Sequence, residues 1–212
     1  MKSRINILVN LVGAVAVTMF LSSCSTSKIS MNRAELDRIS TIAIMKFDAA
    51  PGIPAMIVTE CEEAFRGHFL DVGKGVVERA KLRTIMREVE RSQSGLVSSS
   101  EEIGRLSGAQ ALMFGTITRN GEETRLVDYI EYVKNPATKE TEKIKKTRKK
   151  KFYSFQIQGR LVSTSTGAAI LTIKNENPER SYEMTDSMTL NRFRENVLAQ
   201  MGKDLKKALE KK

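Results

Sequence analysis

Residues 75–121 hold the signals that decide the fold, and they read GVVERAKLRTIMREVERSQSGLVSSSEEIGRLSGAQALMFGTITRNG. A short apolar strand at 75–77 leads into a helix over 78–92. The helix is predicted because apolar residues recur at three- and four-residue steps, which places them on one face. These residues are Leu82, Ile85, Met86 and Val89. Gly95 then ends the helix, as glycine commonly does.

The second half of the stretch predicts a shorter helix and a strand. Ser99 and Glu102 match a capping box, in which each side chain satisfies a free backbone N–H group at a helix N-terminus. This helix stops at Gly108, and the apolar run 109–118 predicts a strand. Asn120-Gly121 is typical of a two-residue hairpin turn, so we expect the strand to end there.

The flanking sequence predicts one domain around this unit. The apolar run 40–47 predicts a buried strand, and Pro54 is well placed to open a helix over 55–70. Residues 186–212 repeat apolar residues at helical spacing and predict a long amphipathic helix that packs on the sheet. The predicted fold class is therefore α/β (α+β), a single domain with a mixed sheet and flanking helices.

The N-terminus predicts an exported, lipid-anchored protein. A positively charged start precedes the apolar run 5–20, which has the length of a signal-peptide core and is short for a membrane span. Leu21-Ser22-Ser23-Cys24 follows and resembles the bacterial lipobox, in which the cysteine accepts diacylglycerol. We therefore expect a lipoprotein signal peptide at 1–23, lipidation of Cys24 and a polar tether at 24–38. An ordinary secretory signal with an incidental cysteine is the alternative.

A strongly basic segment lies in the C-terminal half. The whole chain has a formal net charge of +10, which favours anionic partners. Residues 139–151 alone hold eight Lys or Arg and two Glu. This run is predicted to form the tip of a hairpin, an insert at 134–151 between strands at 124–133 and 152–161.

Three interpretations of the basic run remain open. It is a solvated tip, or it contacts anionic lipid headgroups or lipopolysaccharide, or it binds nucleic acid with nearby aromatic residues that stack on bases. The last is least favoured, because an exported lipoprotein seldom meets nucleic acid. The candidate residues for contact with a partner or with headgroups are Lys143, Lys145, Lys146, Arg148, Lys149, Lys150 and Lys151.

Residues that carry catalysis or bind metal ions are sparse. His68 is the only histidine and lies beside the apolar stripe of the helix over 55–70, so a surface or boundary position is the simple interpretation. With Cys24 lipidated, Cys61 is unpaired and is expected to be a small buried hydrophobe. We therefore predict no catalytic residue, no metal site and no cofactor, and a protein that is not an enzyme.

Three motifs resemble the CsgG family, the curli production assembly component. They are VVERAKL at 76–82, SQSGLV at 92–97 and GAQALMFGTIT at 108–118, in the order that the family has them. The family more commonly has Asp where this chain has Gln110. The resemblance covers most of the predicted domain at 39–212. It implies a periplasmic α/β domain similar to anticodon-binding domains, with a tendency to form rings.

The sequence departs from the channel-forming members of that family, which insert two β-hairpins per subunit into the outer membrane. The first hairpin would lie within 121–158, where the alternating faces both mix apolar and charged residues. The basic run cannot enter hydrocarbon, because a charge at the bilayer midplane costs about 2–4 kcal/mol. Residues 174–182 are short and polar and predict a loop in place of the second hairpin. We therefore expect a short relative without clear membrane hairpins.

The resemblance and the lipobox together imply a function. They favour an outer-membrane-anchored, periplasmic, non-catalytic lipoprotein that acts in envelope assembly or export as an oligomeric ring or scaffold. The alternative is a monomeric regulator or adaptor, similar to the LpoB-type activators of penicillin-binding proteins. The expected partners are the outer membrane, through the lipid anchor, and a periplasmic protein or further copies of the chain.

Overall fold

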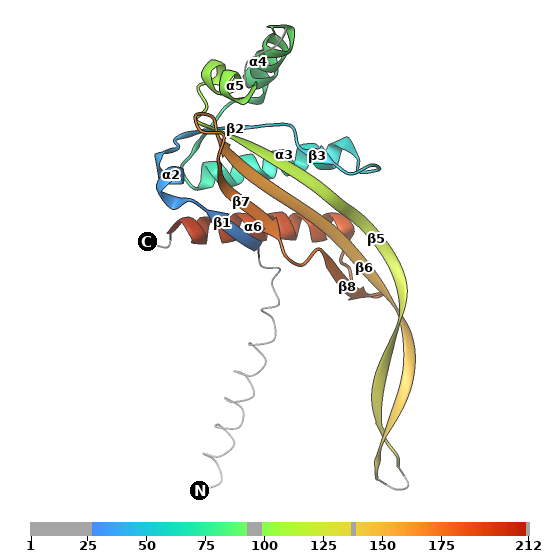
Figure 1. Cartoon of the computed structure of the whole chain (residues 1–212). Coiled ribbons are helices and arrows are strands. Elements are labelled where there is room, and N and C mark those ends of the chain that lie inside the picture. Colours follow the sequence, from blue (N-terminus) through green and yellow to red (C-terminus); the bar gives the residue numbers. More distant parts are fainter. Residues whose placement is uncertain (1–26, 93–98, 137–138, 211–212) are drawn as a thin grey trace, which may run out of the picture.

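The computed structural model describes residues 27–92, 99–136 and 139–210 (Figure 1). Along the chain, its strands and helices are β1 (Ser27–Met31), α2 (Arg33–Arg38), β2 (Thr41–Ile44), β3 (Asp48–Ala49), α3 (Ala55–Asp71), β4 (Gly75–Val76), α4 (Arg79–Ser92), α5 (Ser99–Ser107), β5 (Ala111–Lys134), β6 (Thr141–Ser163), β7 (Ala169–Asn175), β8 (Glu179–Glu183) and α6 (Leu190–Glu210).

The strands of the described residues form one mixed sheet in the order β1-β7-β6-β5-β2-β4. β1, β7, β6 and β5 pair antiparallel in that order, whereas β2 runs parallel to both β5 and β4. β3 continues the edge of β5 beyond β2, and β8 continues the edge of β6 beyond β7. The sheet therefore joins a parallel half to an antiparallel half, and β5 and β6 form its centre.

Helices cover the two faces of the sheet unequally. α3 and α6 pack on one face, where Phe65 and Met201 belong to the main buried cluster. α4 and α5 pack on the other face, beside the first residues of β5, through a second cluster that includes Leu82 (Figure 1). Ile42 and Ala43 are neighbours in β2 and belong to different clusters, because successive strand residues point to opposite faces.

The architecture confirms the predicted fold class: one domain with a mixed sheet and flanking helices. The helix predicted over 55–70 is α3, with Pro54 as its N-cap residue. α5 ends at Ser107, and Gly108 follows with a φ of 73°, a backbone conformation that favours glycine. The likeness to anticodon-binding domains stays a prediction. The capping box predicted at Ser99 and the helix end predicted at Gly95 are not tested, because the Ser99 side chain and Gly95 lie outside the described residues.

The turn predicted at Asn120-Gly121 is wrong. These residues lie within β5 and pair with Phe155 and Ser154 of β6. A register shift between Ile117 and Arg119 accommodates the irregular sequence inside the strand. A turn preference is local, and a partner strand of 23 residues offers continuous ladder hydrogen bonds that outweigh it.

Two further segments carry more structure than we expected. Within the tether predicted at 24–38, Ser27–Met31 form strand β1, which pairs with β7, and the helix Arg33–Arg38 follows. Within the loop predicted at 174–182, residues from Glu179 onward form β8, which pairs with β6. Both strands have only five residues. The alternation of apolar residues that marks a strand in sequence is limited to Ile29 and Met31 in β1, and β8 lacks it.

Candidate functional site

The β5–β6 hairpin projects from the body of the domain (Figure 1). β8 supports it as far as Lys150, which pairs with Glu183. From there to the tip, the described residues of β5 and β6 form strand pairs only with each other. The stretch from Lys150 to Thr141 is about 30 Å long at about 3.3 Å per residue. Without another layer against it, such a ribbon is a candidate surface for contact with something outside the chain.

Aromatic packing holds the base of the hairpin. The ring of Tyr153 in β6 lies 5.4 Å from that of Tyr182 in β8 and 6.2 Å from that of Phe193 in α6. The Tyr153 hydroxyl donates a hydrogen bond to the backbone oxygen of Met188, at 2.7 Å. The base is thus fixed to α6 and β8, while the outer part extends beyond them.

One face of the hairpin continues the face of the sheet that α6 covers. Phe155 and Tyr153 are buried in the core there, and every second residue of β6 toward the tip lies on the same face. The β5 residues directly opposite share it. We call this the α6-side face. Its exposed apolar residues are Leu126, Ile130 and Tyr132, with 69%, 57% and 63% of their surface exposed.

The register divides the predicted basic residues between the two faces. Those of the α6-side face are Lys143, Lys145, Lys149 and Lys151, and those of the opposite face are Lys146, Arg148 and Lys150. Lys149 lies directly across from Leu126, Lys145 from Ile130, and Lys143 from Tyr132. The α6-side face therefore combines an apolar row from β5 with a cationic row from β6.

The opposite face is largely neutralised by acidic residues. Lys146 forms an ion pair with Glu131, which raises the pKa of the lysine. Arg148 and Lys150 both pair with Glu183 of β8, at 3.2 and 3.1 Å. Free positive charge is thus concentrated on the α6-side face.

On the α6-side face, Lys145 is the lysine with an ion pair. Its Nζ lies 2.7 Å from Asp128, and this contact, together with a hydrogen bond from Thr147, lowers the pKa of the Asp128 carboxyl. Lys143 lies over the Tyr132 ring, 5.8 Å from its centroid. No ion pair of Lys143, Lys149 or Lys151 is found among the described residues.

The sequence identified the basic residues but did not predict that they lie in a β-strand. We expected a tip, yet the run from Thr141 onward is part of β6. The exposed apolar row was visible as the alternation Leu126, Ile130, Tyr132, but its side of the sheet depends on the register of the whole hairpin. The contact role of the seven basic residues stays a prediction, and Cys24 lies outside the described residues.

His68 and Cys61, the other residues considered for chemistry in the sequence, both pack inside the domain. His68 is half-buried at the boundary of α3 and α6. Cys61 is fully buried, and burial raises the pKa of its thiol to about 12. Among the described residues, no group of three or more metal-ligating side chains comes together. In the described part of the chain, no helix is both long and apolar enough to cross a membrane.

The fold and the hairpin define a class: a single-domain α+β protein with a long, basic, projecting β-ribbon. The sequence profile described as "Curli production assembly/transport component CsgG" matches residues 72–209, the larger part of the chain. The protein therefore belongs to the CsgG family, and with it to a class of envelope-associated, non-catalytic proteins. No curated protein sequence matches the chain.

Several solved structures align with much of the chain. A PelC dodecamer from Paraburkholderia phytofirmans shares 10% identity with a TM-score of 0.46, over 88% of this chain and 99% of that one. Lipoprotein GNA1162 from Neisseria meningitidis shares 12% identity with a TM-score of 0.46, over 77% and 99%. LpoB from E. coli shares 13% with a TM-score of 0.40, over 68% and 59%.

Proposed function

We propose that this chain is an outer-membrane-anchored periplasmic lipoprotein of envelope assembly or export, which works as an oligomeric scaffold and contacts anionic lipid headgroups through the α6-side face of its hairpin. The observation that carries the proposal is the continuation of the core face along the hairpin, uncovered and bordered by lysines. Membership of a curli assembly and transport family supports the general role.

The chemistry of the α6-side face fits the boundary layer of a membrane. Leu126, Ile130 and Tyr132 supply apolar and amphipathic groups, which favour the region between headgroups and acyl chains. Lysines on the adjacent strand can reach phosphate groups, and each contributes about 1 kcal/mol close to an anionic surface. Lys145 and its partner Asp128 also lie on this face, so a position deep in hydrocarbon is unfavourable.

Vesicle binding by a chain that begins at Ser25, and so lacks Cys24, tests the hairpin without the anchor. We expect it to bind vesicles that contain phosphatidylglycerol and to bind phosphatidylcholine vesicles much less. Replacing Lys143, Lys149 and Lys151 by Gln removes three charges from the α6-side face. At about 1 kcal/mol each, this weakens binding about a hundredfold.

The matched control replaces Lys146, Arg148 and Lys150 by Gln, which removes three charges from the opposite face. Because these side chains are already paired with acidic residues, we expect a smaller loss. Equal losses for both triple variants would show that net charge alone governs binding, and would contradict the assignment of a face.

Lipidation is tested separately in cells. With Cys24 acylated, the protein fractionates with the outer membrane, and a Cys24→Ala chain loses mature lipid-modified protein. Recovery of an unmodified, soluble periplasmic form of the original chain would instead support an ordinary secretory signal.

A monomeric regulator of a periplasmic enzyme is the second candidate. The observation that favours it is the short segment between β7 and α6, where the five-residue β8 stands in place of a second projecting hairpin. Size-exclusion chromatography with light scattering on the chain from Ser25 separates the candidates. An oligomer supports the scaffold, and a monomer at high concentration supports the regulator.

A further inference from the structure

A second charged surface lies at the sheet edge where β2 ends, far from the hairpin tip. α3 and α4 flank a hollow of about 260 Å³ there. Its apolar lining is Ile44, Leu82 and Met86, and its charged lining is Lys46, Glu62, Arg79, Arg83 and Arg87. We call this hollow and its lining the α3–α4 groove.

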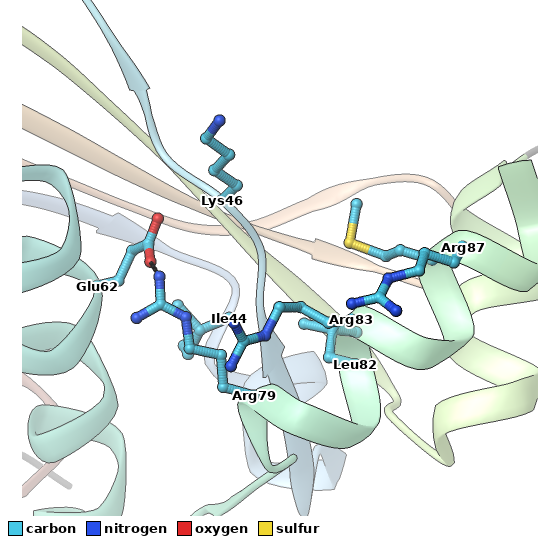
Figure 2. Close-up of a pocket in the computed structure, with 8 residues that line it drawn as sticks. Ile44, Lys46, Glu62, Arg79, Leu82, Arg83 and Arg87 are labelled. Atoms are coloured by element: carbon cyan, nitrogen blue, oxygen red, sulfur yellow. Dashed lines mark hydrogen bonds and ion pairs between the residues drawn. The ribbon is translucent and has the colours of Figure 1, made fainter. Parts of the chain in front are cut away.

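Three arginines follow one side of α4 along the groove. Arg79, Arg83 and Arg87 are four residues apart, and Figure 2 shows their side chains along the same side of the helix. Arg79 reaches across to α3 and forms ion pairs with Glu62 and Glu63. Lys46 stands at the rim, with its side chain directed away from the arginines in Figure 2.

The single acidic residue that lines the groove is already satisfied. Glu62 is buried, accepts a hydrogen bond from the backbone N–H of Phe47 at 3.0 Å, and pairs with Arg79. Glu62 therefore holds Arg79 in place, and both of its carboxylate oxygens already accept hydrogen bonds. Among the described residues, neither Arg83 nor Arg87 has an ion pair, and both are exposed.

The row of arginines beside partly exposed apolar side chains destabilises the free protein and can be stabilised by a bound ligand. Like charges four residues apart destabilise a helix, by about 0.2–0.5 kcal/mol per pair. Beside them, the partly exposed side chains of Ile44 and Met86 border the hollow, with Leu82 below. A ligand that fits must bring negative charge for the arginines and an apolar group for the hollow.

We propose that the α3–α4 groove binds an acidic segment of a protein partner, with an apolar side chain in the hollow and carboxylates on Arg83 and Arg87. Four residues of helix rise about 6 Å. Carboxylates two residues apart on an extended segment are separated by a similar distance, about 6.7 Å. Side chains at alternate positions of an extended segment share one face, so a segment with two acidic residues and one apolar residue at alternate positions can meet both requirements.

The position of the groove favours a protein over a lipid surface. Ile44 pairs with Met113 near the start of β5, whereas the hairpin tip lies beyond Lys134. About 20 residues of strand, roughly 65 Å, separate the two. The membrane contact proposed for the hairpin thus leaves the groove facing other envelope components. This orientation of the groove rests on the proposed function, but the binding test below does not.

The test measures binding of a fluorescein-labelled peptide, GSESESLGS, to the full chain in detergent micelles by fluorescence anisotropy. We expect saturable binding that weakens with salt, and little binding of the neutral peptide GSQSQSLGS. The double variant Arg83→Gln/Arg87→Gln should bind about tenfold more weakly. Met86→Gln, which keeps every charge, should also weaken binding, because it removes apolar surface from the hollow.

The matched control is Arg192→Gln/Lys206→Gln, which removes two exposed positive charges from α6. Its net charge equals that of the Arg83→Gln/Arg87→Gln variant. It should bind as the unmodified chain does, and thermal melting should show that all variants are folded. Equal weakening in both double variants, equal binding of the neutral peptide, or no binding at millimolar peptide would overturn the proposal. A change in oligomeric mass without a change in peptide binding would assign the groove to copies of this chain and overturn it too.

Discussion

At the scale of single residues, two glycines determine how closely α3 packs against the centre of the sheet. Gly115 and Gly159 lie directly opposite each other in β5 and β6. A Cβ at Gly115 would lie 2.2 Å from the Phe47 ring, and one at Gly159 would lie 2.8 Å from the Phe65 ring. These rings are themselves in edge-to-face contact, 5.4 Å apart. The glycines therefore make room for an aromatic pair under α3.

Replacing Gly115 by Ala should lower the free energy of unfolding by about 1–3 kcal/mol, because the added methyl group overlaps a ring that is itself buried. Urea denaturation measures the change. Gly121→Ala in the same strand is the control, since its Cβ would meet the Ser154 hydroxyl at an ordinary 3.4 Å. Equal effects of the two substitutions would contradict overlap with the Phe47 ring as the cause.

His68 gives the stability of the domain a dependence on pH. Its ring lies between Phe65 and Gly202 of α6, where a Cβ on the glycine would be 2.4 Å from the ring nitrogen Nδ1. Nε2 is buried and has no hydrogen-bond partner among the described residues. Burial lowers the pKa of His68, against smaller opposing effects of the Leu198 backbone and Asp71. Burial in the folded protein therefore favours the neutral imidazole.

Because the unfolded chain binds a proton on His68 near pH 6.5, the lowered pKa makes folding less favourable as pH falls below that value. The contribution of neutral His68 to the free energy of unfolding should be fully present at pH 7. It should decrease as pH falls from about 6.5 to the lower pKa that His68 has in the folded state. Urea midpoints at pH 5, 6 and 7 measure this. In His68→Leu the slope over this range should be smaller, and an unchanged slope would assign the pH dependence to other groups.

At the scale of strands, the edge of β6 is shared by β7 and β8, and Asn175 bridges the junction. Its side chain accepts a hydrogen bond from the backbone N–H of Ile157 at 2.8 Å and donates one to the backbone oxygen of Phe155 at 2.7 Å. The N–H of Phe155 donates to Pro178, at 2.7 Å. The amide group thus continues the ladder where β7 ends.

Asn175→Ala should destabilise the domain by at least about 1–3 kcal/mol, because it leaves a buried N–H and a buried C=O group without partners. Denaturation gives the magnitude, and hydrogen exchange should show faster exchange at Ile157 in particular. Asn177→Ala, on the exposed part of the same connection, should be nearly neutral. Unchanged protection of the Ile157 amide would show that water replaces the side chain.

The elements differ in how far the sequence could predict them. α3 and α6 were predictable because their apolar residues repeat at helical spacing, and these residues are buried in the structure. The length of β5 was not, because Asn120-Gly121 is a strong local turn signal and the pairing that overrides it is set by β6. The basic run resembled a loop because the acidic partners of Lys145 and Lys146 lie on the other strand.

The α3–α4 groove was less accessible still to sequence analysis. The arginines of α4 looked like an ordinary solvated helix face, and their i, i+4, i+8 spacing was the sole available signal. Glu62 and Ile44 come from α3 and β2, and their approach to α4 depends on tertiary packing. Surfaces built from three elements in this way leave almost no pattern in a linear sequence.

At the scale of the whole molecule, the first described residue, Ser27, lies at the end of the sheet from which the hairpin projects. Ser27 pairs with Asn175 at the end of β7 nearer the hairpin, and its N–H donates to Asp204 of α6, at 2.8 Å. From the level of Gln158, the partner of Lys174, β6 runs to Thr141, roughly 55 Å further at about 3.3 Å per residue. Two residues, Ser25 and Thr26, link Cys24 to Ser27, and the three Cα-to-Cα steps span at most about 10 Å. With Cys24 lipidated as proposed, the hairpin stays within reach of the membrane.

Lengthening this link should therefore release the hairpin from the membrane. An environment-sensitive dye on Ile130→Cys reports contact, since Cys61 is buried with its pKa raised to about 12 and does not react. In vesicles carrying the lipidated protein, we expect blue-shifted emission. A spacer of about 20 Gly/Ser residues before Ser27, with a mean span of about 25 Å, should reduce the shift.

The same dye on Ser165→Cys, in the β6–β7 turn, should show little shift in either chain. Water-like emission from position 130 in the unmodified anchor, or a shift that the spacer leaves unchanged, would contradict a hairpin held at the membrane by its short link.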